Sequence, residues 1–286
     1  METWSEDARK GTSGSPAPIR PGTSATLPPT RTEENIDVTV LPFEGTYPVL
    51  YGTLAVPVGS HYRRGYLARP DRSGRFPTTL VVPDVGGLTS HEKSVCRRLA
   101  RQGVAALAVE LFEETPSDLD AGIAAYAELS DSEALRILDE VHQYLDSDDL
   151  EWCHAGSLGI LGLDVGGRFA LIEATLRPWV GAVAVVSTPL TGDEDRRHQV
   201  ADLLASIPVP LLGLYGGDDP LIAAATVDEA QRRNPSGTWL LYAGARHFFT
   251  DEDSEDYHEA AAADALTRIA EFLRSHLPPA DVEELG

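Results

Sequence analysis

Residues 162–166 read Gly-Leu-Asp-Val-Gly, and this segment constrains the fold more than any other part of the chain. An apolar, strand-like run over 158–161 leads into it, and a helix-like run over 166–174 follows it. Glycine at both ends permits a tight turn in which two backbones approach closely. A strand, a Gly-x-nucleophile-x-Gly turn and a helix form a nucleophile elbow, whose central residue is usually Ser or Cys. Here that residue is Asp164, so the sequence predicts the scaffold of the site and leaves its chemistry open.

Apolar strands and amphipathic helices alternate after residue 76. We expect strands near 79–82, 104–111, 158–163, 181–186, 210–215 and 238–242, and helices near 91–102, 133–146, 166–174, 222–233 and 255–275. Such alternation predicts an α/β fold with a mostly parallel central sheet and helices on both faces. Two earlier strand-like segments, 36–41 and 49–56, are expected to pair as a hairpin.

The ends of the chain differ in composition from its centre. Residues 1–33 are rich in Ser, Thr, Pro and Gly without apolar periodicity, which predicts a disordered or loosely packed N-terminal arm. Residues 34–278 are expected to form one domain, and 279–286 an acidic C-terminal tail.

The formal net charge of −22 disfavours two classes of partner, nucleic acids and anionic membranes. No stretch of about 18 apolar residues and no secretory signal is present, so we expect a cytoplasmic protein acting on a small molecule. Monomer and homodimer both remain open. Only two of the 23 basic residues are lysines, which fits a GC-rich genome or, less simply, a salt-adapted source.

The two cysteines, Cys96 and Cys153, have no metal-type spacing, and we expect neither a metal site nor a cofactor. Both are expected to be inert packing residues. A reactive pair of Cys153 with His154 is the alternative.

Three further segments follow strands in the way that a hydrolytic site requires. Residues 83–87 follow the first core strand at the position of an oxyanion loop, where the backbone N–H groups of Val85 and Val165 are the expected donors. Asp219 follows strand 210–215, and His247 follows strand 238–242. The chain order is therefore nucleophile, acid and histidine.

From about residue 34 to 278 the chain resembles the dienelactone hydrolase family of α/β-hydrolases. The resemblance rests on the segments 80–87, 97–103, 106–112, 162–167, 216–219 and 246–249. It implies an α/β-hydrolase fold without a large cap domain and a catalytic set of Asp164, His247 and Asp219. It also places Asp84, Gly86 and Phe248 in the substrate pocket, with Asp84 at an acidic position that in the family helps to control the cysteine.

Two departures from the family pattern bear on the substrate. Asp164 replaces the usual Cys, and the stretch 249–253, Phe-Thr-Asp-Glu-Asp, lacks the arginine that holds a substrate carboxylate. An anionic dienelactone would be repelled there, so we expect a neutral or weakly polar substrate.

Aspartate at the elbow favours acid–base chemistry over acyl transfer, because attack on an ester would form a more reactive anhydride. Proton transfer by Asp164 and His247 suits ring closure, elimination or isomerisation, as in secondary metabolism. Attack on saturated carbon, as in hydrolysis of an epoxide or a carbon–halogen bond, is an alternative. An ester or lactone hydrolase with a substituted nucleophile, and a catalytically dead ligand-binding module, are the others.

Overall fold

The computed structural model describes residues 45–147, 150–192 and 198–281. The chain divides into two units, 1–39 and 40–286, and every described residue belongs to the second. The predicted N-terminal arm and the predicted strand over 36–41 lie outside the described residues, so the domain boundaries remain a proposal.

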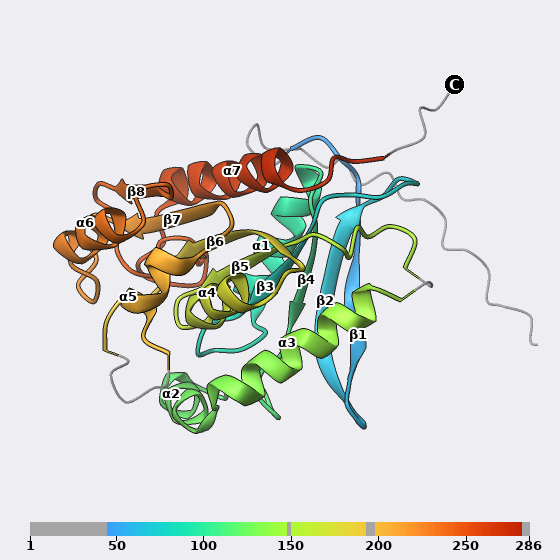
Figure 1. Cartoon of the computed structure of the whole chain (residues 1–286), viewed down its shortest axis with the longest axis horizontal. Coiled ribbons are helices and arrows are strands. Elements are labelled where there is room, and N and C mark those ends of the chain that lie inside the picture. The colour runs from blue at the N-terminus through green and yellow to red at the C-terminus, as the bar shows by residue number, and fades with distance from the viewer. Residues whose placement is uncertain (1–44, 148–149, 193–197, 282–286) are drawn as a thin grey trace, which may run out of the picture. The chain divides into compact units, whose positions relative to one another are not determined.

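Within the described residues, eight strands form one sheet in the order β1-β2-β4-β3-β5-β6-β7-β8 (Figure 1). The strands are β1 (Val49–Val58), β2 (His61–Pro70), β3 (Thr78–Val82), β4 (Ala105–Val109), β5 (Leu158–Leu163), β6 (Val180–Val186), β7 (Leu211–Gly216) and β8 (Thr238–Tyr242). From β4 to β8 all neighbours are parallel, whereas β1 and β2 pair antiparallel at one edge. This arrangement confirms the predicted α/β-hydrolase fold.

Helices cover both faces of the sheet, which explains why its central strands are apolar at nearly every residue. The helices are α1 (Ser90–Arg101), α2 (Leu119–Glu128), α3 (Asp131–Leu145), α4 (Gly166–Leu176), α5 (Val200–Leu203), the 3₁₀ turn η1 (Leu204–Ser206), α6 (Ala224–Arg233) and α7 (Glu259–His276). Figure 1 shows α3 and α4 on one side of the strands and α1 with α7 on the other. Each side has its own apolar core.

Because β3, β5, β6, β7 and β8 run parallel, the carboxyl ends of β3, β5, β7 and β8 lie at the same end of the sheet, where ligands bind in open α/β folds. The loops that follow these strands carry Asp84, Asp164, Asp219 and His247. Between β6 and β7 the described chain holds only α5 and η1, so no large cap occurs there.

Besides the short turns α5 and η1, two elements were not predicted from the sequence. The strand β2 pairs with β1 along its whole length, from Val49 opposite Pro70 to Val58 opposite His61, and its three arginines obscure any apolar alternation. The helix α2 has a weakly amphipathic sequence, and its Gly122 lies where an added Cβ would be 2.2 Å from the Val85 carbonyl oxygen. It is therefore packed directly on the oxyanion loop.

Among the described helices none is both long enough and apolar enough to cross a membrane. At the C-terminal side, the backbone of Asp281 forms a two-hydrogen-bond bridge with the backbone of Arg75.

Candidate active site

The turn between β5 and α4 has the strained geometry of an elbow. Asp164 has φ +46°, in the left-handed region that non-glycine residues rarely adopt. A Cβ added to Gly162 would lie 2.2 Å from the Gly167 Cα, and one added to Gly167 would lie 1.8 Å from Thr188 Oγ1, which explains why both positions are glycine. The Asp164 N–H donates to the Val186 carbonyl oxygen at 2.9 Å and fixes the turn against β6. Strain held in this way is typical of functional residues.

The His247 ring lies between two carboxylates. Its Nε2 is 3.1 Å from Asp164 Oδ1, and its Nδ1 is 2.7 Å from Asp219 Oδ2. Asp219 is fixed in turn, because its Oδ1 accepts hydrogen bonds from the backbone N–H groups of Leu221 and Ile222 at 2.7 and 3.0 Å. Two ionised carboxylates on opposite ring nitrogens call for a proton on each nitrogen, which is the imidazolium form.

Electrostatics favour this imidazolium. Burial by itself lowers the pKa of His247, but the hydrogen bonds and negative charges of Asp164 and Asp219 outweigh it, and the pKa is raised. The side chains of His247 and Asp219 are 2% and 0% exposed, so little water screens the attraction.

A residue that sequence reasoning missed holds the histidine loop in place. Ser187, directly after β6, has φ +49° and donates from Oγ to the His247 carbonyl oxygen at 2.6 Å. The only available sequence signal was the small polar residue at the end of a buried strand.

The two predicted oxyanion donors come from loops after neighbouring strands, Val85 from the loop after β3 and Val165 from the elbow after β5. Within the described chain, the N–H groups of Val85 and Val165 form no hydrogen bond to the protein. The neighbouring Gly86 N–H is occupied, because it donates to Asp84 Oδ1 at 2.6 Å.

A cavity of about 90 Å³ opens beside Asp164 and His247. Besides Asp164 and His247, its described lining residues are Pro189, Leu190, Thr191, Leu221, Ile222 and Thr226. Apart from His247, this lining has no cationic side chain. The predicted pocket residues Asp84, Gly86 and Phe248 are not among these lining residues, although the Phe248 ring packs edge-on against the His247 ring with centroids 4.6 Å apart.

Comparison with known proteins agrees with this architecture. The profile of the Dienelactone hydrolase family matches residues 63–277. The chain belongs to the dienelactone hydrolase family. A relative from Escherichia coli K12 named "Putative carboxymethylenebutenolidase" is 30% identical over 243 residues, 80% of this chain and 88% of the relative. A Bradyrhizobium relative named "Probable 2-oxo-3-(5-oxofuran-2-ylidene)propanoate lactonase" is 30% identical over 226 residues, 75% of this chain and 90% of the relative.

A crystal structure titled as a putative dienelactone hydrolase from Klebsiella pneumoniae superposes with a TM-score of 0.72. It is 26% identical in sequence, and the match covers 79% of this chain and 98% of that one. The near-complete coverage of the solved chain means that this dienelactone hydrolase family member shares the fold of that chain over almost its whole length.

Next to the oxyanion loop of this family member lies a buried cluster of Asp84, His91 and Glu92. Burial, followed by the charge of Glu92, raises the pKa of Asp84 to about 7. Burial likewise raises the pKa of Glu92 to about 7 and lowers that of His91. The sequence did not single out Glu92, because nothing in a helical repeat marks a buried acid.

The acidic segment after His247 faces α1 rather than the cavity. Ser90 Oγ donates to Asp253 Oδ2, and Arg98 forms an ion pair with Glu252 at 3.3 Å. Arg246, directly before His247, forms an ion pair with Asp256 at 2.6 Å.

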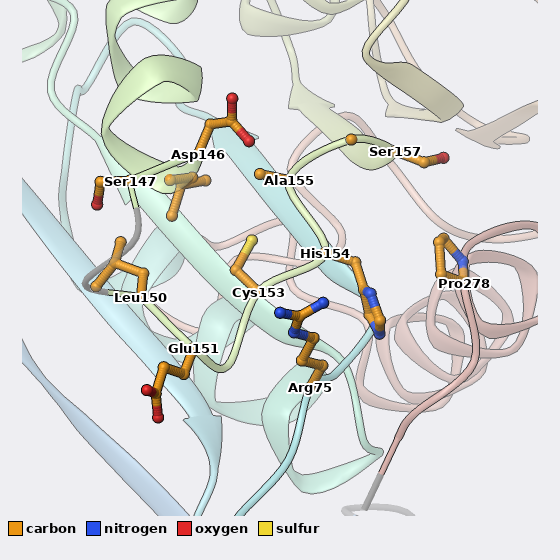
Figure 2. Close-up of a pocket in the computed structure, with 12 residues that line it drawn as sticks. Arg75, Asp146, Ser147, Leu150, Glu151, Cys153, His154, Ala155, Ser157 and Pro278 are labelled. Atoms are coloured by element: carbon orange, nitrogen blue, oxygen red, sulfur yellow. The ribbon is translucent and has the colours of Figure 1, made fainter.

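A second cavity, of about 380 Å³, is lined in part by Cys153, whose backbone pairs with that of Phe76 in an isolated β-bridge (Figure 2). These residues precede β5 and β3, so the cavity lies at the opposite end of these strands from Asp164. Figure 2 shows Arg75, Cys153 and His154 around it. Burial raises the pKa of the Cys153 thiol to about 11, so the reactive thiolate is scarce at neutral pH. The alternative of a reactive Cys153–His154 pair is therefore disfavoured.

Proposed function

We propose that this dienelactone hydrolase family member opens or closes the ring of a small neutral lactone by acid–base chemistry at Asp164 and His247. The observation that carries the proposal is the His247 ring hydrogen-bonded on both nitrogens to carboxylates. This arrangement places a base and an acid 3.1 Å apart in one buried site. The lactone-hydrolase names of two relatives support the substrate class.

In the ring-opening direction Asp164 accepts a proton from a water molecule, and the oxygen of that water attacks the lactone carbonyl carbon. The N–H groups of Val85 and Val165 bind the oxyanion that develops. The ring C–O bond then breaks, and His247 donates its Nε2 proton to the leaving alkoxide. Asp164 returns the proton to His247 across their hydrogen bond, which restores the starting state, and ring closure follows the same steps in reverse.

The described lining of the cavity supports a neutral substrate. The described lining is apolar apart from two threonines, Asp164 and His247, and it offers no arginine or lysine to a substrate carboxylate. A carboxylate-bearing lactone would place a second anion beside Asp164, and the described lining has no arginine or lysine to compensate for it. We therefore expect neutral lactones and their hydroxy acids to be turned over in preference to dienelactone.

The first prediction concerns the acid–base pair itself. With a panel of neutral lactones and hydroxy acids, D164N and H247A are each expected to lower kcat about 10³-fold or more, because each removes one of the two proton carriers. The measurement is steady-state turnover in both directions. The proposal is wrong if both variants keep wild-type turnover of a substrate that the wild type accepts. Saturable binding of that panel without turnover, unchanged in H247A, would identify a binding module instead.

A second candidate is nucleophilic attack by Asp164 on a saturated carbon, favoured by its position at the strained elbow. It would form an alkyl ester on Asp164, which His247 and water would hydrolyse. A single turnover in H₂¹⁸O separates the two. Acid–base catalysis labels the product carboxylate and leaves Asp164 unlabelled, whereas the alkyl-enzyme route puts ¹⁸O into the Asp164 side chain. An alkyl adduct trapped on Asp164 in H247A with an epoxide or halide would support only the second.

A further inference from the structure

The buried cluster beside the oxyanion loop contains three metal-ligating side chains that the proposed reaction does not use. Asp84, His91 and Glu92 each place one ligating atom within 4.8 Å of the other two. His91 and Glu92 are 6% and 0% exposed, while Asp84 is only partly buried and leaves a route from solvent. The sequence spacing gave no sign of this cluster, because Asp84 comes from the loop after β3 and the other two from α1.

Two atoms of the cluster are buried without a hydrogen-bond partner. They are His91 Nδ1 and Glu92 Oε1. Each residue is otherwise anchored: His91 Nε2 lies 3.2 Å from Thr250 Oγ1, and Glu92 Oε2 accepts from the N–H and hydroxyl of Thr89 at 2.8 and 2.6 Å. The anchoring contacts leave the unpartnered atoms facing one another, and an unpaired buried polar atom is costly unless a ligand satisfies it.

The separation of these two atoms suits a shared ion. His91 Nδ1 and Glu92 Oε1 are 3.7 Å apart, which is too long for a hydrogen bond. Two ligands that each lie about 2.1 Å from one ion are separated by at most about 4.2 Å. The nitrogen and oxygen therefore already lie at a metal-bridging distance, and Asp84, with a ligating atom within 4.8 Å of the other two residues, joins them after a shift of its side chain.

Local charge also favours a cation. Among the described residues no arginine or lysine pairs with Asp84 or Glu92. The other charged groups that act on the cluster are mainly carboxylates: Asp164, Asp251, Glu252 and Asp253. A divalent ion would stabilise the ionised forms of Asp84 and Glu92, which no arginine or lysine of the described chain pairs with.

We propose that Asp84, His91 and Glu92 bind a divalent transition-metal ion beside the oxyanion loop. One imidazole and two carboxylates form a donor set that Zn²⁺ accepts, with water completing the shell. The site is separate from the Asp164–His247 pair, and binding of the ion does not depend on the proposed reaction.

Zinc titration of the full chain by isothermal calorimetry, after treatment with a chelator and its removal, tests the site. Sodium chloride at about 0.5 M suppresses loose association of cations with the acidic surface. One Zn²⁺ is expected to bind per chain with a Kd below about 10 µM, and E92Q and H91A are each expected to weaken it at least about tenfold. E92Q keeps an acceptor for Thr89, so the helix cap survives.

E252Q is the matched control, because Glu252 is an exposed acid near the same helix that is outside the ligand set. Its Kd is expected to stay within about twofold of the wild type. Co²⁺ in place of Zn²⁺ provides a second readout, with visible d–d bands in the wild type that are lost in H91A. Absence of saturable Zn²⁺ binding, or equal affinity in the wild type, E92Q and H91A, overturns the proposal. Because no substrate is present, that result would leave the acid–base function untouched.

Discussion

At the scale of single residues, two adjacent aspartates in the loop after β7 have opposite environments. Asp219 is buried, bonded to His247 and held by two backbone N–H groups, whereas the Asp218 side chain is exposed. Replacing Asp219 by Asn puts an amide N–H against His247 Nδ1 and removes the charge that stabilises the imidazolium. We expect D219N to lower kcat about 10²- to 10⁴-fold and D218N to change it less than about twofold. Equal losses in the two variants would contradict the assignment of Asp219.

The raised pKa of His247 gives the same pair a pH signature. The proposed acid is the imidazolium, so activity is retained while His247 is protonated and falls as the pH rises through its raised pKa. Loss of the Asp219 charge lowers that pKa, and the alkaline limb of the kcat/KM profile is expected to move to lower pH in D219N. The profile of D218N should coincide with the wild type. An alkaline limb that stays in place in D219N would show that another group sets it.

At the scale of elements, the elbow depends on close contact between β5 and α4. A methyl group at Gly162 would lie 2.2 Å from the Gly167 Cα, and the backbone there has no free space to yield. We expect G162A to lower the free energy of unfolding by about 3 kcal/mol or more. Gly52 in β1 has no atom within 4 Å of an added Cβ, so G52A is expected to change the free energy of unfolding by less than about 1 kcal/mol. Chemical denaturation of both variants makes the comparison, and a stable G162A would contradict it.

The helix α4 carries an acid that its packing does not satisfy. Glu173 is 0% exposed, neither carboxylate oxygen has a hydrogen-bond partner, and its nearest cation, Arg177, is 3.6 Å away and is already bonded twice to Asp139. Burial, followed by the charge of Asp139, raises the pKa of Glu173 to about 8. The native state therefore holds a proton that the unfolded chain releases near pH 4.5.

The sign of the resulting pH dependence follows from linkage. The contribution of Glu173 is fully present below pH 4.5 and is lost as the pH rises to about 8. We expect E173Q to match the wild type near pH 4.5 and to exceed it at pH 8 to 9 by a free energy of unfolding on the order of a few kcal/mol. Exposed Glu271 provides the control, since E271Q also removes one carboxylate and should leave the pH dependence of the free energy of unfolding unchanged. A parallel stability profile for E173Q would exclude a buried, protonated Glu173.

At the scale of the whole molecule, the sequence was enough to predict the alternating strands and helices and the loop order that ends in Asp164, Asp219 and His247. These features depend on local periodicity, glycine placement and strand order, which a sequence carries directly. The Arg-rich strand β2 and the weakly amphipathic α2 were not predicted, because contacts with distant segments stabilise them. The burial of Glu92 and Glu173 was missed for the same reason: helix periodicity does not reveal which neighbours cover a polar side chain.

The net charge of −22 acts on the molecule as a whole. Many surface arginines already pair with carboxylates, as in the Arg136–Glu133 and Arg233–Glu229 contacts, so the excess acids repel one another without compensation. Salt reduces the range of this repulsion from about 10 Å at 0.1 M to about 3 Å at 1 M. Salt also weakens the exposed ion pairs, but each of these contributes only about 0.5 kcal/mol to the free energy of unfolding. We expect Tm to rise by about 5 °C or more between 0.05 and 1 M NaCl with a chelator present. Choline chloride of equal ionic strength should give the same rise, because screening does not depend on the cation. A Tm that is flat or falls would mean that the surface ion pairs outweigh the repulsion.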